Sequence, residues 1–132
     1  MTTRLLIADD DLPSLKLAAY LLEHAGYATL TADNGERAVA VALQARPDAI
    51  ICDLQMPMLD GFEVLRRVRQ DPAASRTIVI AVTAYAMVGD QQKVLQAGFD
   101  GYISKPIETE NFVQQIEAFL PAALRARPGG AS

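Results

Sequence analysis

Three aspartates follow two short apolar runs of the chain, at the positions where two strands would end. Asp9 and Asp10 come directly after the run at residues 5–8, and Asp53 comes directly after the run at 49–52. If these runs are neighbouring parallel strands, their tips place three carboxylates in one pocket. Two unit charges about 4 Å apart repel by about 4 kcal/mol at an effective dielectric of roughly 20, so the group needs a cation or a protonated member. Oxygen ligands favour a hard divalent ion, for which Mg²⁺ is the leading candidate, and a carboxylate beside such an ion can accept a phosphoryl group as a nucleophile.

Two further polar residues end apolar runs on the same expected edge. Thr83 follows residues 78–82, and Lys105 follows residues 102–104. A threonine hydroxyl could donate a hydrogen bond to a phosphoryl oxygen, and a lysine ammonium could balance its charge. Taken singly, the threonine would be interpreted as an exposed cap and the lysine as a solvated charge. Their convergence with three acids favours a functional interpretation of both.

The rhythm of the chain predicts the element that brings these residues together. Short apolar runs alternate with longer segments of helical period, which indicates an α/β fold with a doubly wound parallel sheet of five strands and five crossover helices. The expected strands are 5–8, 27–31, 49–53, 78–82 and 101–104, and the expected helices are 13–25, 35–46, 61–71, 89–97 and 109–120. In such sheets a ligand binds at the carboxyl ends of the strands, where the strand order reverses.

Two segments differ from this regular pattern. The helix at 89–97 offers few core residues, mainly Val94 and Leu95, and is therefore expected to be marginally stable. Residues 121–132 are rich in alanine, arginine, proline and glycine, which predicts a flexible tail. We expect one domain at 1–120 followed by this tail.

Composition narrows the classes of protein that fit. The 132 residues carry a net charge of −4, which argues against direct binding to nucleic acid. One cysteine, Cys52, excludes an internal disulfide and fits a reducing compartment. No apolar stretch approaches the roughly 18 residues of a membrane span, and the first strand begins too near Met1 for a signal peptide. We therefore expect a cytoplasmic protein that does not contact the membrane.

Several residues have simpler interpretations than chemistry. Asp11 is expected to cap a helix, and Cys52 is expected to be a core residue. Gly61 is expected to serve the turn into its helix. His24 is expected at the surface near a helix end, which argues against a histidine phosphodonor.

Four motifs together resemble a known family. They are Asp9-Asp10 after the first strand, Asp-Leu-Gln-Met-Pro-Met-Leu-Asp-Gly at residues 53–61, Thr83-Ala84 after the fourth strand and Lys105-Pro106 after the fifth. Over residues 4–120 the chain resembles the receiver domain of response regulators in two-component signalling. The resemblance implies the flavodoxin-like receiver fold with strand order 2-1-3-4-5.

The resemblance also implies a chemistry for the acids. Asp53 would be the phosphoacceptor, taking its phosphoryl group from a histidine kinase or a histidine phosphotransfer protein. Asp10 and Asp53 would bind Mg²⁺ directly, the backbone carbonyl of Gln55 would be a third ligand, and Asp9 would act through water. Beyond phosphorylation and dephosphorylation at Asp53, no enzyme activity is expected.

The resemblance further suggests how a signal would arise. Thr83 and Lys105 would contact the phosphoryl oxygens, and the bond from Lys105 to Pro106 would be cis. A phosphoryl group adds about two negative charges, so Thr83 would move toward it and Tyr102 would rotate into the space left behind. The fourth helix, fifth strand and fifth helix would then present a changed face to a downstream protein. Tyr85 would lie near the phosphoryl group, and its bulk would limit the access of water to that group.

Other interpretations remain open at this point. A magnesium-dependent phosphatase with an aspartyl phosphate would need an Asp-x-Asp nucleophile motif and a cap domain, and a flavin module would need a phosphate loop where Asp9 and Asp10 lie. A receiver-like module could bind partners without phosphate. The start at Met1 and the expected loose tail favour a stand-alone regulator, monomeric or weakly dimeric, over a receiver excised from a hybrid kinase.

Overall fold

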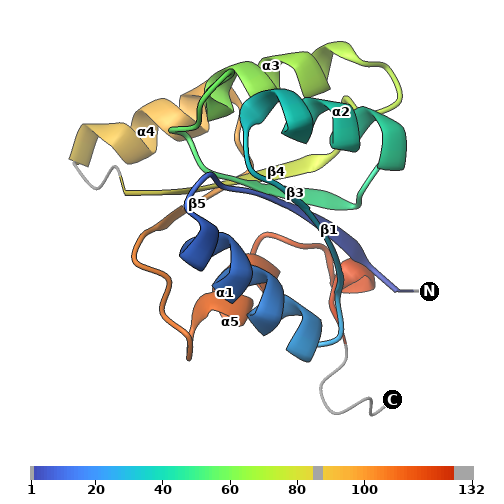
Figure 1. Cartoon of the computed structure of the whole chain (residues 1–132), viewed down its shortest axis with the longest axis vertical. Coiled ribbons are helices and arrows are strands. Elements are labelled where there is room, and N and C mark those ends of the chain that lie inside the picture. Colours follow the sequence, from blue (N-terminus) through green and yellow to red (C-terminus); the bar gives the residue numbers. More distant parts are fainter. Residues whose placement is uncertain (1, 85–87, 127–132) are drawn as a thin grey trace.

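Five parallel strands form the centre of the protein. The computed structural model describes residues 2–84 and 88–126. The strands lie in the order β2-β1-β3-β4-β5 (Figure 1), which confirms both the expected fold class and the order implied by the resemblance. Their bounds are β1 Arg4–Ala8, β2 Ala28–Ala32, β3 Ala49–Cys52, β4 Ile78–Thr83 and β5 Gly101–Ser104.

Helices cover both faces of this sheet. Helices α2, α3 and α4 lie on one face, and α1 and α5 lie on the other (Figure 1). The bounds are α1 Leu12–His24, α2 Gly35–Ala45, α3 Gly61–Gln70, α4 Val88–Ala97 and α5 Phe112–Glu117. Throughout the described residues, no helix combines the length and the apolar character that crossing a bilayer would require.

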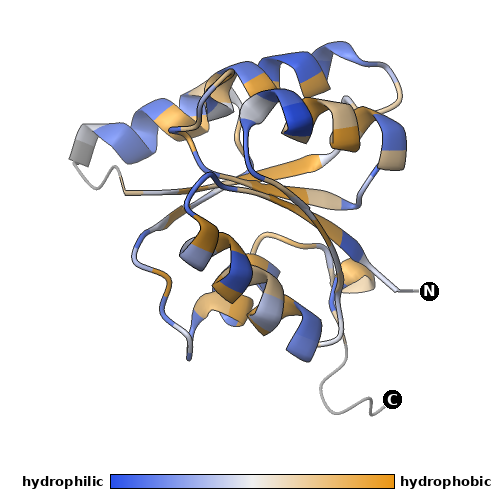
Figure 2. Ribbon diagram, viewed as in Figure 1, coloured by the Kyte–Doolittle hydropathy of each residue, from blue (hydrophilic) through white to orange (hydrophobic). Residues whose placement is uncertain are grey.

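The three central strands, β1, β3 and β4, are apolar on both faces because both faces are buried. Side chains alternate across the sheet, so each row of aligned residues faces one helical layer. One row packs toward α2, α3 and α4, and the next packs toward α1 and α5; these rows are Leu6, Ile50 and Val79, and Ile7, Ile51 and Ile80. Figure 2 shows hydrophobic strands at the centre of the sheet, between helices in which hydrophilic and hydrophobic residues alternate. The two cores fix the strands in register.

Side chains cap the helices that follow the first three strands. The carboxylate of Asp11 accepts a hydrogen bond from the Ser14 N–H, the amide oxygen of Asn34 accepts one from the Arg37 N–H, and the carboxylate of Asp60 accepts one from the Glu63 N–H. Each cap satisfies a backbone donor that the helix itself leaves without a partner. The capping role expected for Asp11 is therefore confirmed.

Helix α4 rests on the sheet through fewer core contacts than expected. Val94 is fully buried, whereas 44% of Leu95 is exposed, so the prediction that Leu95 contributes to the core was wrong. Successive residues on a helix point about 100° apart, and Val94 takes the inward position. Such a small apolar contact between the helix and the sheet is typical of a marginally stable helix.

The C-terminal region differs from the sequence prediction in two ways. Helix α5 is shorter than the expected 109–120, since the chain on either side of it forms turns. The expected flexible tail begins with packed residues instead: Ala122–Leu124 is a 3₁₀ helix, and the carbonyl of Leu124 accepts a hydrogen bond from the Thr3 hydroxyl at 2.6 Å. Leu124 and Ala126 pack against the core because both are apolar. Residues 127–132 of the predicted tail lie outside the described residues.

Tyr27 joins this C-terminal segment to the rest of the fold. Its hydroxyl donates a hydrogen bond to Glu117 Oε2 at 2.5 Å and accepts one from the Ala126 N–H at 2.9 Å. Burial raises the pKa of Tyr27 to about 12, and the hydrogen bond to Glu117 acts in the same direction. The phenol is therefore held in its neutral, donating form.

We predict that Tyr27→Phe lowers the free energy of unfolding by about 1–2 kcal/mol, because both hydrogen bonds are lost. Urea unfolding near neutral pH measures the difference. The folded-state pKa is raised from 10.0 to about 12, so the advantage of wild type should be full below pH 10 and should disappear as the pH rises through 12. A difference that stays constant over this range would contradict the role of the phenol proton.

Candidate functional site

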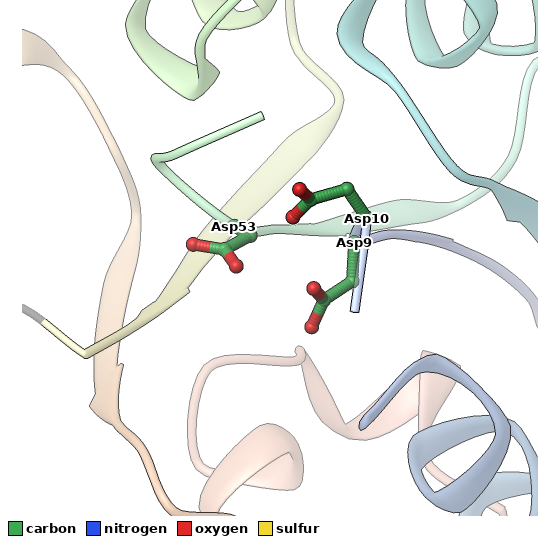
Figure 3. A group of neighbouring side chains, drawn as sticks. All are labelled: Asp9, Asp10 and Asp53. Carbon is green, nitrogen blue, oxygen red and sulfur yellow. The ribbon is translucent and has the colours of Figure 1, made fainter. Parts of the chain in front are cut away.

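The three aspartates converge at the carboxyl ends of β1 and β3 (Figure 3). Ala8 pairs with Cys52 in the sheet, and the Asp53 N–H donates a hydrogen bond to the Ala8 carbonyl at 2.9 Å, so the residues that follow both strands lie side by side. Carboxylate oxygens of Asp9, Asp10 and Asp53 all lie within 4.8 Å of one another. The strand order reverses between β1 and β3, which is where ligands bind in sheets of this type.

The members of this acid cluster differ in exposure to water. Asp9 is 4% exposed and Asp53 is 7% exposed, whereas Asp10 lies at the surface. Burial raises the pKa of Asp9, although hydrogen bonds from Lys105 and the Asp11 N–H act in the opposite direction. The cluster therefore combines two buried carboxylates, Asp9 and Asp53, with one that is exposed to solvent, Asp10.

Lys105 connects the two buried acids. Its Nζ lies 2.8 Å from Asp9 Oδ2 and 2.9 Å from Asp53 Oδ2. Burial alone would lower the pKa of Lys105, but the hydrogen bonds to both carboxylates outweigh it and raise the pKa. The bond from Lys105 to Pro106 is cis, as the resemblance implied. The ammonium thus remains charged between the acids.

The charge and the donor atoms of the cluster fit a magnesium ion. Three carboxylates and one ammonium leave about two negative charges, which a divalent cation would neutralise, and all the candidate ligand atoms are oxygens. Asp53 Oδ1 also accepts a hydrogen bond from the Gln55 N–H at 3.2 Å, so the loop that carries the Gln55 carbonyl is held beside the acids. Asp9, Asp10, Asp53 and Gln55, expected around the metal, thus share one edge of the sheet.

Thr83 and Lys105 are adjacent through the backbone. Thr83 is fully buried at the end of β4, and its carbonyl accepts a hydrogen bond from the Lys105 N–H at 2.8 Å. Tyr102 is half-buried on β5 and packs against the core that includes α4. Burial raises the pKa of Tyr102, and the nearby charge of Asp90 adds to this effect. Tyr85, expected near the phosphoryl group, lies outside the described residues.

Gly61 has a closer relation to the site than the sequence indicated. A Cβ on Gly61 would lie 2.5 Å from the Asp53 carbonyl oxygen, and the Gly61 N–H donates to the Leu54 carbonyl at 2.9 Å. Helix α3 can therefore begin directly against the backbone of the central acid only because residue 61 has no side chain. A glycine eight positions after Asp53 was visible in the sequence, but the contact that requires it was not.

Two residues that were set aside from the chemistry lie where expected. Cys52 is fully buried, and burial raises the pKa of its thiol, with the charge of Asp53 as a second cause. His24 is exposed at the end of α1, where its ring stacks on Tyr20 at a centroid distance of 5.7 Å. The Cys52 thiol is thus a protonated group within the core, and the His24 imidazole lies away from the acids.

Sequence comparison identifies relatives along almost the whole chain. A family model described as the response regulator receiver domain matches residues 5–117. The polar-differentiation response regulator DivK of Brucella anthropi is 38% identical over 120 residues, which cover 91% of this chain and 98% of DivK. DivK of Brucella ovis has the same identity and coverage.

Solved structures share the same arrangement of elements. The chemotaxis response regulator CheY4 of Vibrio cholerae has a TM-score of 0.85 and 29% identity, and the match covers 91% of this chain and 100% of CheY4. The receiver domain of the sensor histidine kinase PA1611 from Pseudomonas aeruginosa has a TM-score of 0.81 and 29% identity over 90% of this chain and 98% of that domain. That structure has a magnesium ion coordinated in its active-site cleft.

We predict that Asp10→Asn stabilises the metal-free protein, because it removes one of three converging negative charges. It should also weaken Mg²⁺ binding about tenfold, which removes about 1.4 kcal/mol of the stabilisation that saturating Mg²⁺ provides. Urea unfolding in EDTA and in excess Mg²⁺ measures both effects. Glu110→Gln, which removes an exposed acid outside the cluster, is the matched control. Equal stabilisation of Asp10→Asn and wild type by Mg²⁺ would contradict a metal site at the cluster.

Proposed function

The chain belongs to the response regulator receiver domain family of two-component signalling, and on this premise we propose that Asp53 is its phosphoacceptor. The observation that carries the proposal is the position of Asp53 at the centre of the cluster. One carboxylate oxygen is held by the Lys105 ammonium and the other by the Gln55 N–H. A carboxylate oriented in this way is prepared to act as a nucleophile.

The proposed metal ligands are Asp10, Asp53 and the Gln55 carbonyl, with Asp9 acting through water. When bound, Mg²⁺ would supply positive charge for the acids and for the oxygens of the phosphoryl group. The oxygen donors and the excess negative charge of the cluster support this ligand set.

The proposed donor is a phosphohistidine of a histidine kinase or histidine phosphotransfer protein. An Asp53 oxygen would attack phosphorus and form an O–P bond, while the N–P bond to the donor imidazole breaks and that nitrogen takes a proton. The Lys105 ammonium and the Thr83 hydroxyl would donate hydrogen bonds to the phosphoryl oxygens. Hydrolysis of the acyl phosphate would release inorganic phosphate and restore the carboxylate, so the protein would modify only itself.

We predict that wild type gains the mass of one phosphoryl group when it is incubated with Mg²⁺ and acetyl phosphate, and that Asp53→Ala gains none. Intact-mass spectrometry measures both. The adduct requires the Asp53 carboxylate because it is the nucleophile, and omission of Mg²⁺ should suppress it.

The remaining outcomes separate the alternatives. No adduct despite Mg²⁺ binding would indicate that only a protein donor is accepted. No adduct and no Mg²⁺ binding would favour a receiver-like module that binds partners without phosphate. An adduct on Asp53→Ala would disprove the assignment of the phosphoacceptor.

The proposed output surface consists of α4, β5 and α5 and would be read by a downstream protein. Thr83 would turn toward the phosphoryl group, and Tyr102 would move into the space that Thr83 leaves. The buried position of Thr83 and the half-buried position of Tyr102 beside the weakly anchored α4 support this coupling. A helix with few core contacts can change position at small energetic cost.

We predict that Tyr102→Ala still accepts the phosphoryl group but loses the change in the amide NMR spectrum of α4 and β5 that phosphorylation produces in wild type. The aromatic ring is expected to carry the movement from Thr83 to α4. Tyr20→Ala, an exposed tyrosine on the opposite helical layer, should behave as wild type. An unchanged spectral response in Tyr102→Ala would count against the coupling.

A further inference from the structure

The loop between β3 and α3 contains a strained turn beside the acid cluster. Met58 has a φ of 75°, in the left-handed region that residues with side chains rarely adopt. The Leu59 N–H donates a hydrogen bond to the Pro57 carbonyl at 2.9 Å, which closes a three-residue turn around Met58. An i to i+2 turn with a positive central φ is the rare and strained form of the γ-turn. Such a conformation persists only where the surrounding structure holds it.

The N-terminus of α2 supplies that support. The Gly35 N–H donates a second hydrogen bond to the Pro57 carbonyl at 3.3 Å. A Cβ on Gly35 would lie 1.9 Å from the Leu59 carbonyl oxygen and 2.7 Å from the Leu59 Cβ. The first residue of α2 therefore lies directly on the backbone of the strained turn, and only glycine permits this approach.

The same loop reaches the acid cluster at its other end. The Gln55 N–H donates a hydrogen bond to Asp53 Oδ1, and Pro57, with its restricted φ, lies between Gln55 and the turn. Because the segment is short and stiff, displacement of Leu59 must be absorbed within a few residues of the Gln55 carbonyl. The position of α2 and the position of that carbonyl are thus mechanically linked.

We propose that Gly35 is a positioning residue for the metal site: the N-terminus of α2, acting through the turn at Met58, sets the position of the loop that carries the Gln55 carbonyl and thereby sets the affinity for Mg²⁺. The inference rests on the proposed function, in which that carbonyl is a ligand. Gly35 itself contacts the loop, at Pro57 and Leu59, and would act on the metal site through that loop.

The test is the Kd for Mg²⁺ of Gly35→Ala, measured by isothermal titration calorimetry on protein shown to be folded by circular dichroism. We expect the Kd to rise about tenfold or more, the usual effect of removing support from a metal ligand. Gly101→Ala is the matched control, because its Cβ would lie 2.5 Å from the Phe119 ring, remote from the loop in sequence and at the opposite end of its strand. It should lose stability and keep the wild-type Kd.

A second pair of variants tests the turn without touching α2. Met58 is 70% exposed, so its replacement leaves the core intact. Met58→Gly tolerates the positive φ, whereas the β-branched side chain of Met58→Val opposes it. We expect Met58→Val to bind Mg²⁺ several times more weakly than Met58→Gly. This comparison decides the question if Gly35→Ala does not fold.

Each outcome bears on one proposal. A wild-type Kd in folded Gly35→Ala, or equal Kd values for the two Met58 variants, would overturn the positioning role. Failure of wild type to bind Mg²⁺ would instead overturn the proposed metal site on which this inference rests. Equal weakening in Gly35→Ala and Gly101→Ala would show a general effect of destabilisation and would also overturn the positioning role.

Discussion

Mutual repulsion among carboxylates is the constraint on which the arrangement of this protein depends. Asp9 and Asp53 are buried next to each other, and Asp10 adds a third charge within the same small volume. Paired strands whose side chains fill two cores hold the acids together, and Lys105 offsets part of their charge. The remaining negative charge makes this edge of the sheet receptive to a cation.

The backbone around the acids is as closely packed as the side chains. Gly61 lets α3 begin against the Asp53 carbonyl, and Gly35 lets α2 lie against the turn at Met58. Two helices therefore define the path of the loop from opposite ends. The positive φ of Met58 shows that this path is imposed on the chain by its surroundings.

The far side of the proposed output surface is firmly anchored. Arg69 donates a hydrogen bond to the Thr77 carbonyl at 2.6 Å and forms an ion pair with Asp100 at 3.0 Å, and the same carboxylate accepts a hydrogen bond from the Val79 N–H at 2.8 Å. These contacts tie α3 to the start of β4 and to the residue that precedes β5. Helix α4 is anchored mainly by Val94. It thus lies between the segment at residues 98–100, which these contacts hold in place, and the end of β4 that carries Thr83. A change beside Thr83 would therefore displace α4 more easily than the anchored segment at residues 98–100.

The fold class could be predicted from the amino-acid sequence because apolar periodicity reports burial. The family and the candidate residues could be predicted because the acids, Thr83 and Lys105 each follow an apolar run, in an order that resembles receiver domains. Expectations that relied on local pattern alone were less accurate: Leu95 is exposed, and the segment after residue 120 packs through Leu124 and Ala126. The bridge from Lys105 to two acids and the contact of Gly35 with Leu59 became evident only in the folded protein. Those interactions join segments distant in the chain, and their geometry depends on how closely packed elements approach, which no local pattern encodes.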